Sequence, residues 1–193
     1  AAGRLPVDSA SGVTMRAQIR PKSMPVIALL VLALLVAVRR CPTGDRDREP
    51  PSASAVGECR VARLADGDSL TCVGGARVRL LGIDAPELAQ PPFGRRSEEA
   101  LRDLIGDTPL RLEYDVDVHD RFGRLLAYAW AGPVLVNERL VRDGWAVAYG
   151  GPPNDRHGAR LRAAEAAARR DGAGHWSSGG FACLPVDHRQ GRC

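Results

Sequence analysis

Three short runs of β-forming residues follow one another in the middle of this chain. They cover residues 59–65, 69–73 and 77–83, with Asp-Gly in the first gap and Gly-Gly in the second. Such dipeptides are strong hairpin signals, because tight hairpin turns need residues that accept positive φ. The pattern therefore predicts an antiparallel meander of three strands.

The residues after the meander predict further elements in a definite order. Residues 94–105 carry apolar side chains at helical spacing and end at Gly-Asp, which is typical of an amphipathic helix. The remaining expected elements are strands at 110–118 and 125–130 and helices at 134–143 and 160–170. This order predicts an α+β fold, mainly β, in which about three helices pack outside a five-stranded barrel.

Positive charge is concentrated in the first 57 residues. They contain eight of the 27 basic residues and four of the 23 acidic ones, which leaves 19 of each sign in the remainder. A broad basic face for passive nucleic-acid binding is therefore not indicated. Phosphate binding would have to come from individually placed arginines.

An apolar leader precedes the expected domain. Residues 24–38 carry no charge and follow Arg16, Arg20 and Lys22, which is the polarity of a signal peptide and is short for a spanning helix. Arg39-Arg40 is a poor cleavage context, so a short uncleaved membrane anchor is the alternative. Either leader would export the domain, as a secreted or a membrane-anchored protein, and membrane contact would be made through residues 24–38.

Composition suggests four segments. Residues 1–41 form the leader, and residues 42–57 predict a disordered linker because they are rich in Pro, Ser, Asp and Arg. The folded domain is expected at 58–178, followed by a tail at 179–193.

Five cysteines fit an oxidising compartment. Cys59 and Cys72 flank the first turn and could face each other across a hairpin. Cys183 and Cys193 could close a small loop in the tail, which leaves Cys41 unpaired. The alternative is that some of these cysteines are buried thiols.

Two acidic motifs flank the meander, Asp66-Gly67-Asp68 and Asp84-Ala85-Pro86-Glu87. Taken singly, the first is an ordinary hairpin turn and the second an ordinary strand exit. In a meander, however, the first turn and the end of the third strand can meet at one rim, where Asp68 and Asp84 could share a cation. Ca²⁺ accepts such oxygen ligands, with water completing the coordination shell. Neither motif contains His or Cys, which argues against zinc as the catalytic ion.

Three arginines could act together with the two acidic motifs. Arg79 on the third strand could be a surface ion pair, and Arg121 and Arg124 could serve solubility. Attack on phosphorus, however, adds charge to non-bridging oxygens that two guanidinium groups can bind bidentately. Glu87 could accept a proton from water. The combination predicts a metal-assisted phosphodiesterase.

Residues from about 59 to 176 resemble the thermonuclease, or staphylococcal-nuclease-like, family. Five pieces in order carry the resemblance: V-A-R-L-A-D-G-D-S-L, R-V-R-L-L-G-I-D-A-P-E, D-R-F-G-R-L-L-A-Y, V-N-E-R-L-V-R-D-G-W-A and A-E-A-A-A-R. The resemblance implies an OB-fold barrel with three helices. It also implies a Ca²⁺-dependent endonuclease that cleaves DNA and RNA to 3′-phosphate ends.

The resemblance also assigns roles to individual residues. Asp68 and Asp84 match the calcium carboxylates, and Ala85 matches a ligand that binds through its backbone carbonyl. Glu87 matches the acidic catalytic residue.

The remaining matches concern the substrate. Arg79 and Arg124 match the arginines on the scissile phosphate, while Arg121 and Tyr149 match residues near the nucleotide. The chain departs from the family after Tyr149, where Gly-Gly-Pro-Pro stands and a second tyrosine is lacking.

These observations predict an exported, monomeric, Ca²⁺-dependent nuclease acting on DNA and RNA. The alternative from another class is a non-catalytic nucleic-acid or protein-binding barrel, which would normally have lost one or more of Asp68, Asp84, Glu87, Arg79 and Arg124. All five are present.

Overall fold

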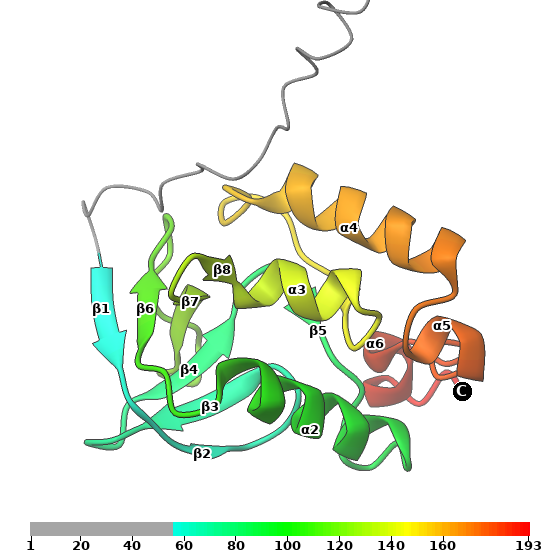
Figure 1. Cartoon of the computed structure of the whole chain (residues 1–193), viewed down its shortest axis with the longest axis horizontal. Helices are drawn as coiled ribbons and strands as arrows, with labels where there is room; N and C mark the ends of the chain where they lie inside the picture. The colour runs from blue at the N-terminus through cyan, green and yellow to red at the C-terminus, as the bar shows by residue number, and fades with distance from the viewer. Residues whose placement is uncertain (1–55) are drawn as a thin grey trace, which may run out of the picture. The chain divides into compact units, whose positions relative to one another are not determined.

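The computed structural model describes residues 56–193, which contain a seven-stranded mixed sheet, a separate pair of two-residue strands and helices packed against them (Figure 1). The strands of the seven-stranded sheet are β1 Val56–Cys59, β2 Val61–Leu64, β3 Ser69–Cys72, β4 Arg77–Leu80, β6 Leu110–Glu113, β7 Leu125–Ala131 and β8 Val134–Leu135. The hydrogen-bonded order is β1-β6-β7-β4-β3-β2, with β8 beside β7. β4 and β7 are parallel, whereas β2, β3 and β4 form the predicted antiparallel meander.

The sheet does not close into the expected five-stranded barrel through hydrogen bonds. β1 and β2 lie at opposite ends of the paired order, although only Arg60 separates them in sequence. β1 pairs with β6 while β2 pairs with β3, so the chain turns a corner at Arg60. The N–H of Val73 donates to the Arg60 carbonyl at 2.7 Å and holds this corner. The α+β class is confirmed, and the barrel is corrected to an open mixed sheet.

Five helices accompany the sheet in the described residues: α2 Phe93–Ile105, α3 Val136–Arg142, α4 Gly158–Asp171, α5 His175–Ser178 and α6 Pro185–Arg189. The first three match the predicted helices closely, and α3 contacts both α2 and α4 (Figure 1). Residues 134–135 were expected to be helical but pair with the end of β7, because Gly132 takes φ 57° and makes a tight hairpin.

The strand expected at 110–118 ends early, at Glu113. Beyond it the backbone bonds largely to a distant loop, although Val118 and His119 still pair with the start of β7. Asn154 accepts from the N–H of Asp117 at 2.8 Å and donates to the Asp117 carbonyl at 3.0 Å. The Asp115 carboxylate accepts from the N–H of Arg156 at 3.0 Å. The Asn154 side chain therefore takes the place of strand-to-strand hydrogen bonds at Asp117, and β6 ends after four residues.

The core fills the space between the sheet and the helices. Val78 and Leu80 of β4, Leu101 of α2, Leu140 of α3 and Leu161 of α4 are all fully buried. Burial of such side chains contributes about 1.5–3 kcal/mol each. This core fixes the position of β4, from which the candidate site is built.

Both expected disulfides are present. Cys59–Cys72 ties β1 to β3, and Cys183–Cys193 closes a loop that contains α6. We call residues 183–193 the 183–193 loop.

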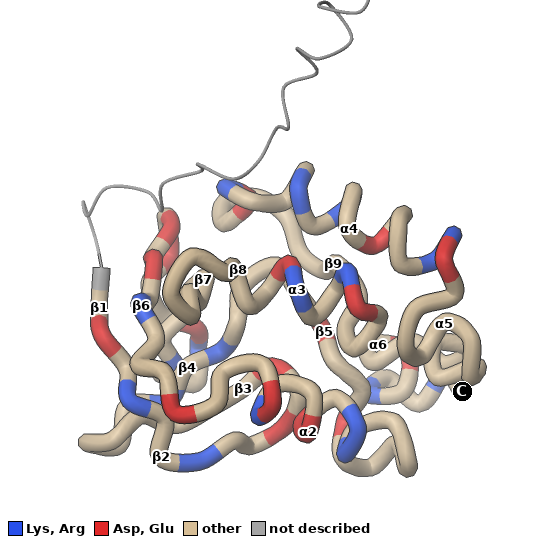
Figure 2. The backbone as a smooth tube through the Cα atoms, viewed as in Figure 1, with Lys and Arg blue, Asp and Glu red and all other residues tan. Residues whose placement is uncertain are grey.

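Basic and acidic residues are interspersed along the described chain, as the sequence count suggested (Figure 2). None of the helices described here is long and apolar enough to cross a membrane. Cys41 and the apolar leader lie outside the described residues, as does the linker except for Val56 and Gly57, which already belong to β1.

Candidate functional site

The first acidic turn is held in place by a close backbone approach at Gly67. A Cβ added there would lie 2.5 Å from Cβ of Ser97 and 2.8 Å from Cβ of Ala85, so only glycine fits. The Asp66 carboxylate accepts from the N–H of Asp68 at 2.9 Å and closes the turn. The turn is thereby pressed against α2 and against the residue that follows β5.

The second carboxylate lies beside the first. β5 Ile83–Asp84 follows Gly82, which turns the chain with φ 73°, and pairs with β9 Val147–Ala148. The N–H of Ala85 donates to Oδ2 of Asp68 at 2.7 Å, which links the two motifs directly. Asp68 is 5% exposed and Asp84 is fully buried. The expected convergence at one rim is therefore present.

Arg79 binds both carboxylates. Its two terminal nitrogens lie 2.9 Å from Oδ1 of Asp68 and 3.0 Å from Oδ1 of Asp84. Nη1 also donates to the Leu80 carbonyl at 3.1 Å. The side chain is only 15% exposed, so Arg79 is not the outer-face ion pair considered as the alternative.

A second arginine, from the 183–193 loop, reaches Asp84 and also Glu87. Arg189 donates from Nη1 to Oδ1 of Asp84 at 3.0 Å and from Nη2 to Oδ2 at 2.8 Å. Its Nη1 also donates to Oε1 of Glu87 at 2.7 Å. Sequence analysis missed this residue, because Arg189 lies more than 100 positions from either partner and no local motif marks it.

Gln90 also connects the loop to the site, and it too was missed. It is buried, its Oε1 accepts from the N–H of Glu87 at 3.0 Å, and its Nε2 donates to the Cys183 carbonyl at 3.2 Å. The backbone of the candidate proton acceptor and the base of the loop are therefore held by one side chain. A glutamine in a Pro-rich loop carries no distinguishing sequence signal.

Arg124 directly precedes β7, the strand that pairs with the strand of Arg79, but its guanidinium pairs with Asp120. Arg79 is opposite Leu126 in the parallel β4–β7 pair, so Arg124 lies two positions earlier on the neighbouring strand segment. Its Nε donates to Asp120 Oδ2 at 2.7 Å, and Asp120 Oδ1 accepts from the N–H of Arg124 at 2.9 Å. Burial alone would raise the pKa of Asp120, but these bonds together hold it below its usual range.

Arg121 stacks on an exposed ring rather than on any residue of the carboxylate pair. Its guanidinium carbon lies 4.7 Å from the centre of the Phe122 ring, which is 58% exposed. The turn that carries both residues is therefore open to solvent and accessible to a ligand.

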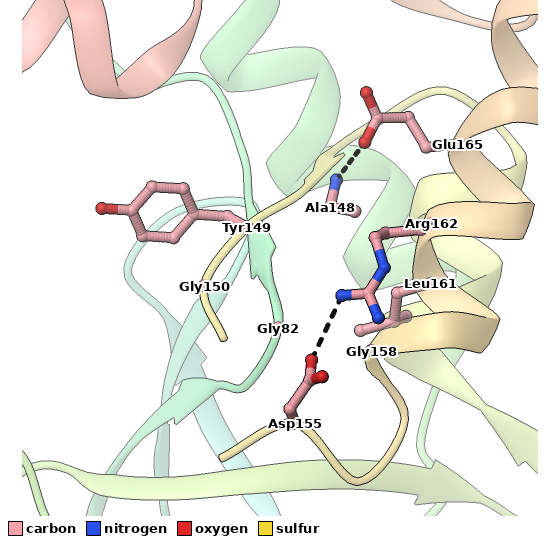
Figure 3. Close-up of a pocket in the computed structure, with 9 residues that line it drawn as sticks. All are labelled: Gly82, Ala148, Tyr149, Gly150, Asp155, Gly158, Leu161, Arg162 and Glu165. Atoms are coloured by element: carbon pink, nitrogen blue, oxygen red, sulfur yellow. Dashed lines mark hydrogen bonds and ion pairs between the residues drawn. The ribbon is translucent and has the colours of Figure 1, made fainter. Parts of the chain in front are cut away.

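Tyr149 follows β9 and lies between two pockets. One, of about 230 Å³, is lined by Tyr149 together with Arg79, Pro153 and Asn154. The other, of about 240 Å³, is lined by Tyr149, Asp155, Arg162 and Glu165. In Figure 3 the ring points away from the Asp155–Arg162 ion pair, and the phenol is 47% exposed. The first pocket joins the candidate nucleotide residue to the site arginine.

Electrostatics in the site favour an added positive charge. Burial raises the pKa of Asp68 to about 7, which Arg79 only partly offsets. Hydrogen bonds to Asp84 raise the pKa of Arg189 above its ordinary value. The Asp68 carboxylate thus remains short of positive charge even beside a guanidinium.

The donor set suits a hard cation. Buried carboxylate oxygens and a backbone carbonyl are the ligands that Ca²⁺ prefers, in contrast to the nitrogen and sulfur ligands of zinc sites. In the part of the chain that the structure describes, three or more His, Cys, Asp or Glu side chains nowhere gather as a ready-made metal cage. A cation here would depend on Asp68, Asp84, the Ala85 carbonyl and water.

Comparison with known proteins agrees with this geometry. A model described as "Staphylococcal nuclease homologue" matches residues 77–178. The chain is 31% identical over 159 residues to the thermonuclease of Staphylococcus intermedius, covering 78% of this chain and 95% of that protein. It is also 33% identical over 129 residues to the endonuclease YncB of Bacillus subtilis, covering 62% of this chain and 61% of that protein. The chain therefore belongs to the staphylococcal nuclease homologue family.

Proposed function

We propose that this protein is a Ca²⁺-dependent endonuclease that hydrolyses phosphodiester bonds of DNA and RNA and leaves 3′-phosphate ends. Family membership and relatives named as nucleases support hydrolysis of nucleic acid. The observation that carries the proposal is the convergence of Asp68 and Asp84 on Arg79, with Glu87 at the same rim.

Asp68, Asp84 and the Ala85 carbonyl would hold the calcium ion. When bound, the ion supplies positive charge near the phosphate and makes a nearby water easier to deprotonate. The Ala85 backbone is already fixed by its hydrogen bond to Asp68 at 2.7 Å, so little ordering is required there.

Each side chain then has a separate role in the reaction. Glu87, whose side chain is 33% exposed, accepts the proton of the attacking water. Arg79 and Arg124 donate to the non-bridging oxygens, whose charge increases during attack on phosphorus. Arg124 exchanges Asp120 for the phosphate in this scheme, and Arg121 and Tyr149 position the nucleotide.

We further propose that the domain works as a monomer outside the cytoplasm, secreted or membrane-anchored. Two disulfides in the described residues support the location outside the cytoplasm, since such bonds persist in oxidising compartments. The signal-peptide or anchor proposal for residues 24–38 rests on their uncharged sequence.

The deciding experiment is a chelator-controlled digestion. The purified protein is incubated with plasmid DNA and with RNA, in Ca²⁺ or in excess EGTA. The 5′ ends of the products are then labelled with a polynucleotide kinase without prior phosphatase treatment, which requires free 5′-hydroxyl groups and so reports that the phosphate stayed on the 3′ side. We expect cleavage of both substrates with Ca²⁺, none with EGTA, and 3′-phosphate ends. Binding without cleavage would instead identify a non-catalytic nucleic-acid module, and EGTA-resistant cleavage would exclude the calcium mechanism.

A further inference from the structure

The candidate site is in direct contact with a segment that lies outside the matched family region. The family model ends at residue 178, whereas the 183–193 loop places Arg189 on Asp84 and Glu87. We propose that this loop regulates the site: Arg189 competes with Ca²⁺ for Asp84 and binds one carboxylate oxygen of Glu87. The inference rests on the proposed function, because it concerns the same carboxylates.

Arg189 makes a tight contact. It binds both oxygens of the fully buried Asp84, at 3.0 and 2.8 Å, and Oε1 of Glu87 at 2.7 Å. Bidentate pairs between guanidinium and carboxylate are among the strongest hydrogen-bonded pairs in proteins. The Arg189 side chain is 37% exposed, so Arg189 lies at the mouth of the site and not beneath it.

The loop is built to hold Arg189 in this position. The Cys183–Cys193 disulfide closes it, and Pro185 at the start of α6 is buried. Gln90 bonds the Cys183 carbonyl on one side and the Glu87 backbone on the other. These attachments reduce the entropy that would be lost on docking a free tail, so the arginine acts as a tethered ligand.

The segment that leads into the loop is anchored as well. The buried ring of Phe181 packs 5.4 Å from the ring of His175 and 4.6 Å from that of Trp176. The loop therefore has a fixed base. Moving Arg189 away requires only a local displacement of α6 and its disulfide-closed end.

The contact uses the oxygens that the reaction needs. Both Asp84 oxygens accept from Arg189, and a cation at Asp84 would have to replace at least one of these bonds. Nη1 of Arg189 also donates to Oε1 of Glu87, one of the two oxygens that could accept a proton from water. A guanidinium is not deprotonated at ordinary pH, so alkalinity does not release it. Release requires displacement by a cation or movement of the loop.

An open pocket lies beside this contact. It has a volume of about 510 Å³ and is lined by Asp66, Glu87, His188 and Arg189, among others. The pocket gives solvent and ions access to Glu87 from the side of α6. A loop displaced toward it would expose Asp84 without disturbing the sheet.

Calcium affinity, not activity, tests the proposal. The chelator-stripped full protein is titrated with Ca²⁺ by isothermal calorimetry, alongside Arg189→Met and the matched control Arg192→Ala. Arg192 belongs to the same loop but pairs with Asp187 and not with the site. We expect Arg189→Met to bind Ca²⁺ at least about tenfold more tightly, because Ca²⁺ then no longer has to displace the Arg189 guanidinium from Asp84. Arg192→Ala should remain within about twofold of the parent.

Thermal melting gives a second readout that is independent of the variant's own stability. Ligand that binds only the folded state raises the Tm in proportion to its occupancy and affinity. We expect a larger Ca²⁺-induced rise in Tm for Arg189→Met than for the parent. The same direction is expected for Cys193→Ser, which opens the loop.

The outcomes separate the two proposals. If the parent binds Ca²⁺ and Arg189→Met binds it no more tightly, the loop proposal is overturned while the proposed function stands. Unchanged Ca²⁺ affinity with a raised KM for DNA would assign Arg189 to phosphate binding instead. If neither protein binds Ca²⁺, both the loop proposal and the calcium mechanism fail.

Discussion

Two buried carboxylates on different elements share a single arginine at the centre of the site. Asp68 comes from the turn before β3 and Asp84 from β5, yet Arg79 contacts both within 3.0 Å. Buried charges that lose a partner are strongly destabilising, so these residues serve the fold as well as the chemistry. For each substitution at the site, both the free energy of unfolding and the reaction rate must therefore be measured.

The catalytic roles proposed for Glu87, Arg79 and Arg124 predict a loss of kcat when each side chain is removed. Glu87→Ala, Arg79→Ala and Arg124→Ala should each lower kcat by about 10²–10³, since each removes one charged group from the transition state. Single-turnover digestion with circular dichroism as a folding check measures this. Arg102→Ala, which breaks only an exposed ion pair with Glu98, is the matched control. Near-normal kcat in all three variants would place the chemistry elsewhere.

Gly67 predicts a positional effect without any change of charge. In Gly67→Ala the new Cβ meets Cβ of Ser97 at 2.5 Å, so the turn must shift away from α2. We expect a loss of about 1–3 kcal/mol in the free energy of unfolding, measured with urea, and weaker Ca²⁺ binding because Asp68 moves. Gly151→Ala, where a Cβ meets nothing within 4 Å, should change neither. An unchanged Ca²⁺ affinity in Gly67→Ala would show that the turn does not set the site.

At the scale of elements, α5 is held by a buried histidine. His175 is fully buried, and its Nε2 lies 3.0 Å from Oγ of Ser97 on α2. Phe93 and Trp145 meet its ring edge-on at 5.2 and 5.0 Å. The imidazole therefore joins α5 to α2 through a buried hydrogen bond, and its aromatic surroundings disfavour the charged form.

This histidine predicts a pH dependence of stability. Burial lowers the pKa of His175 to about 4, against an unfolded value of about 6.5. Above pH 6.5 neither state is protonated, and as the pH falls toward 4 the unfolded chain takes up the proton first. The free energy of unfolding should therefore fall across this window, by about 3 kcal/mol in total. Urea titrations at stepped pH measure it.

The control identifies the group responsible. His175→Phe should flatten the profile between pH 6.5 and 4, whereas His119→Gln, at an exposed position, should leave it unchanged. An equally steep profile in His175→Phe would assign the dependence to other groups.

The elements also show where sequence patterns stop being informative. Hairpin signals located the β2–β3–β4 meander, and helical periodicity located α2 and α4, because turn chemistry and amphipathicity are local properties. β6 was predicted too long because Asn154, 37 residues from Asp117, takes over its backbone bonds. α6 was missed because five residues carry no periodicity.

At the scale of the whole molecule, balanced charge predicts weak dependence of DNA binding on salt. Basic and acidic residues are equal in number over the described chain, so phosphate contacts are limited to about three arginines, Arg79, Arg121 and Arg124. The slope of log affinity against log salt should be about −3 for duplex DNA. Fluorescence anisotropy in EGTA, which prevents cleavage in the proposed mechanism, measures it. A much steeper slope would indicate a broad basic surface.

The sequence by itself determined the family, the α+β class and the identities of Asp68, Asp84 and Arg79 as one cluster. It could do so because each rests on short motifs and on the geometry of a meander. The tertiary structure alone decided that the sheet turns its corner at Arg60, that Arg124 is held by Asp120, and that Arg189 contacts Asp84 and Glu87. The first two depend on competition among backbone and side-chain partners for the same hydrogen bonds. The third joins residues about 100 positions apart, and only the packing of the 183–193 loop brings them together.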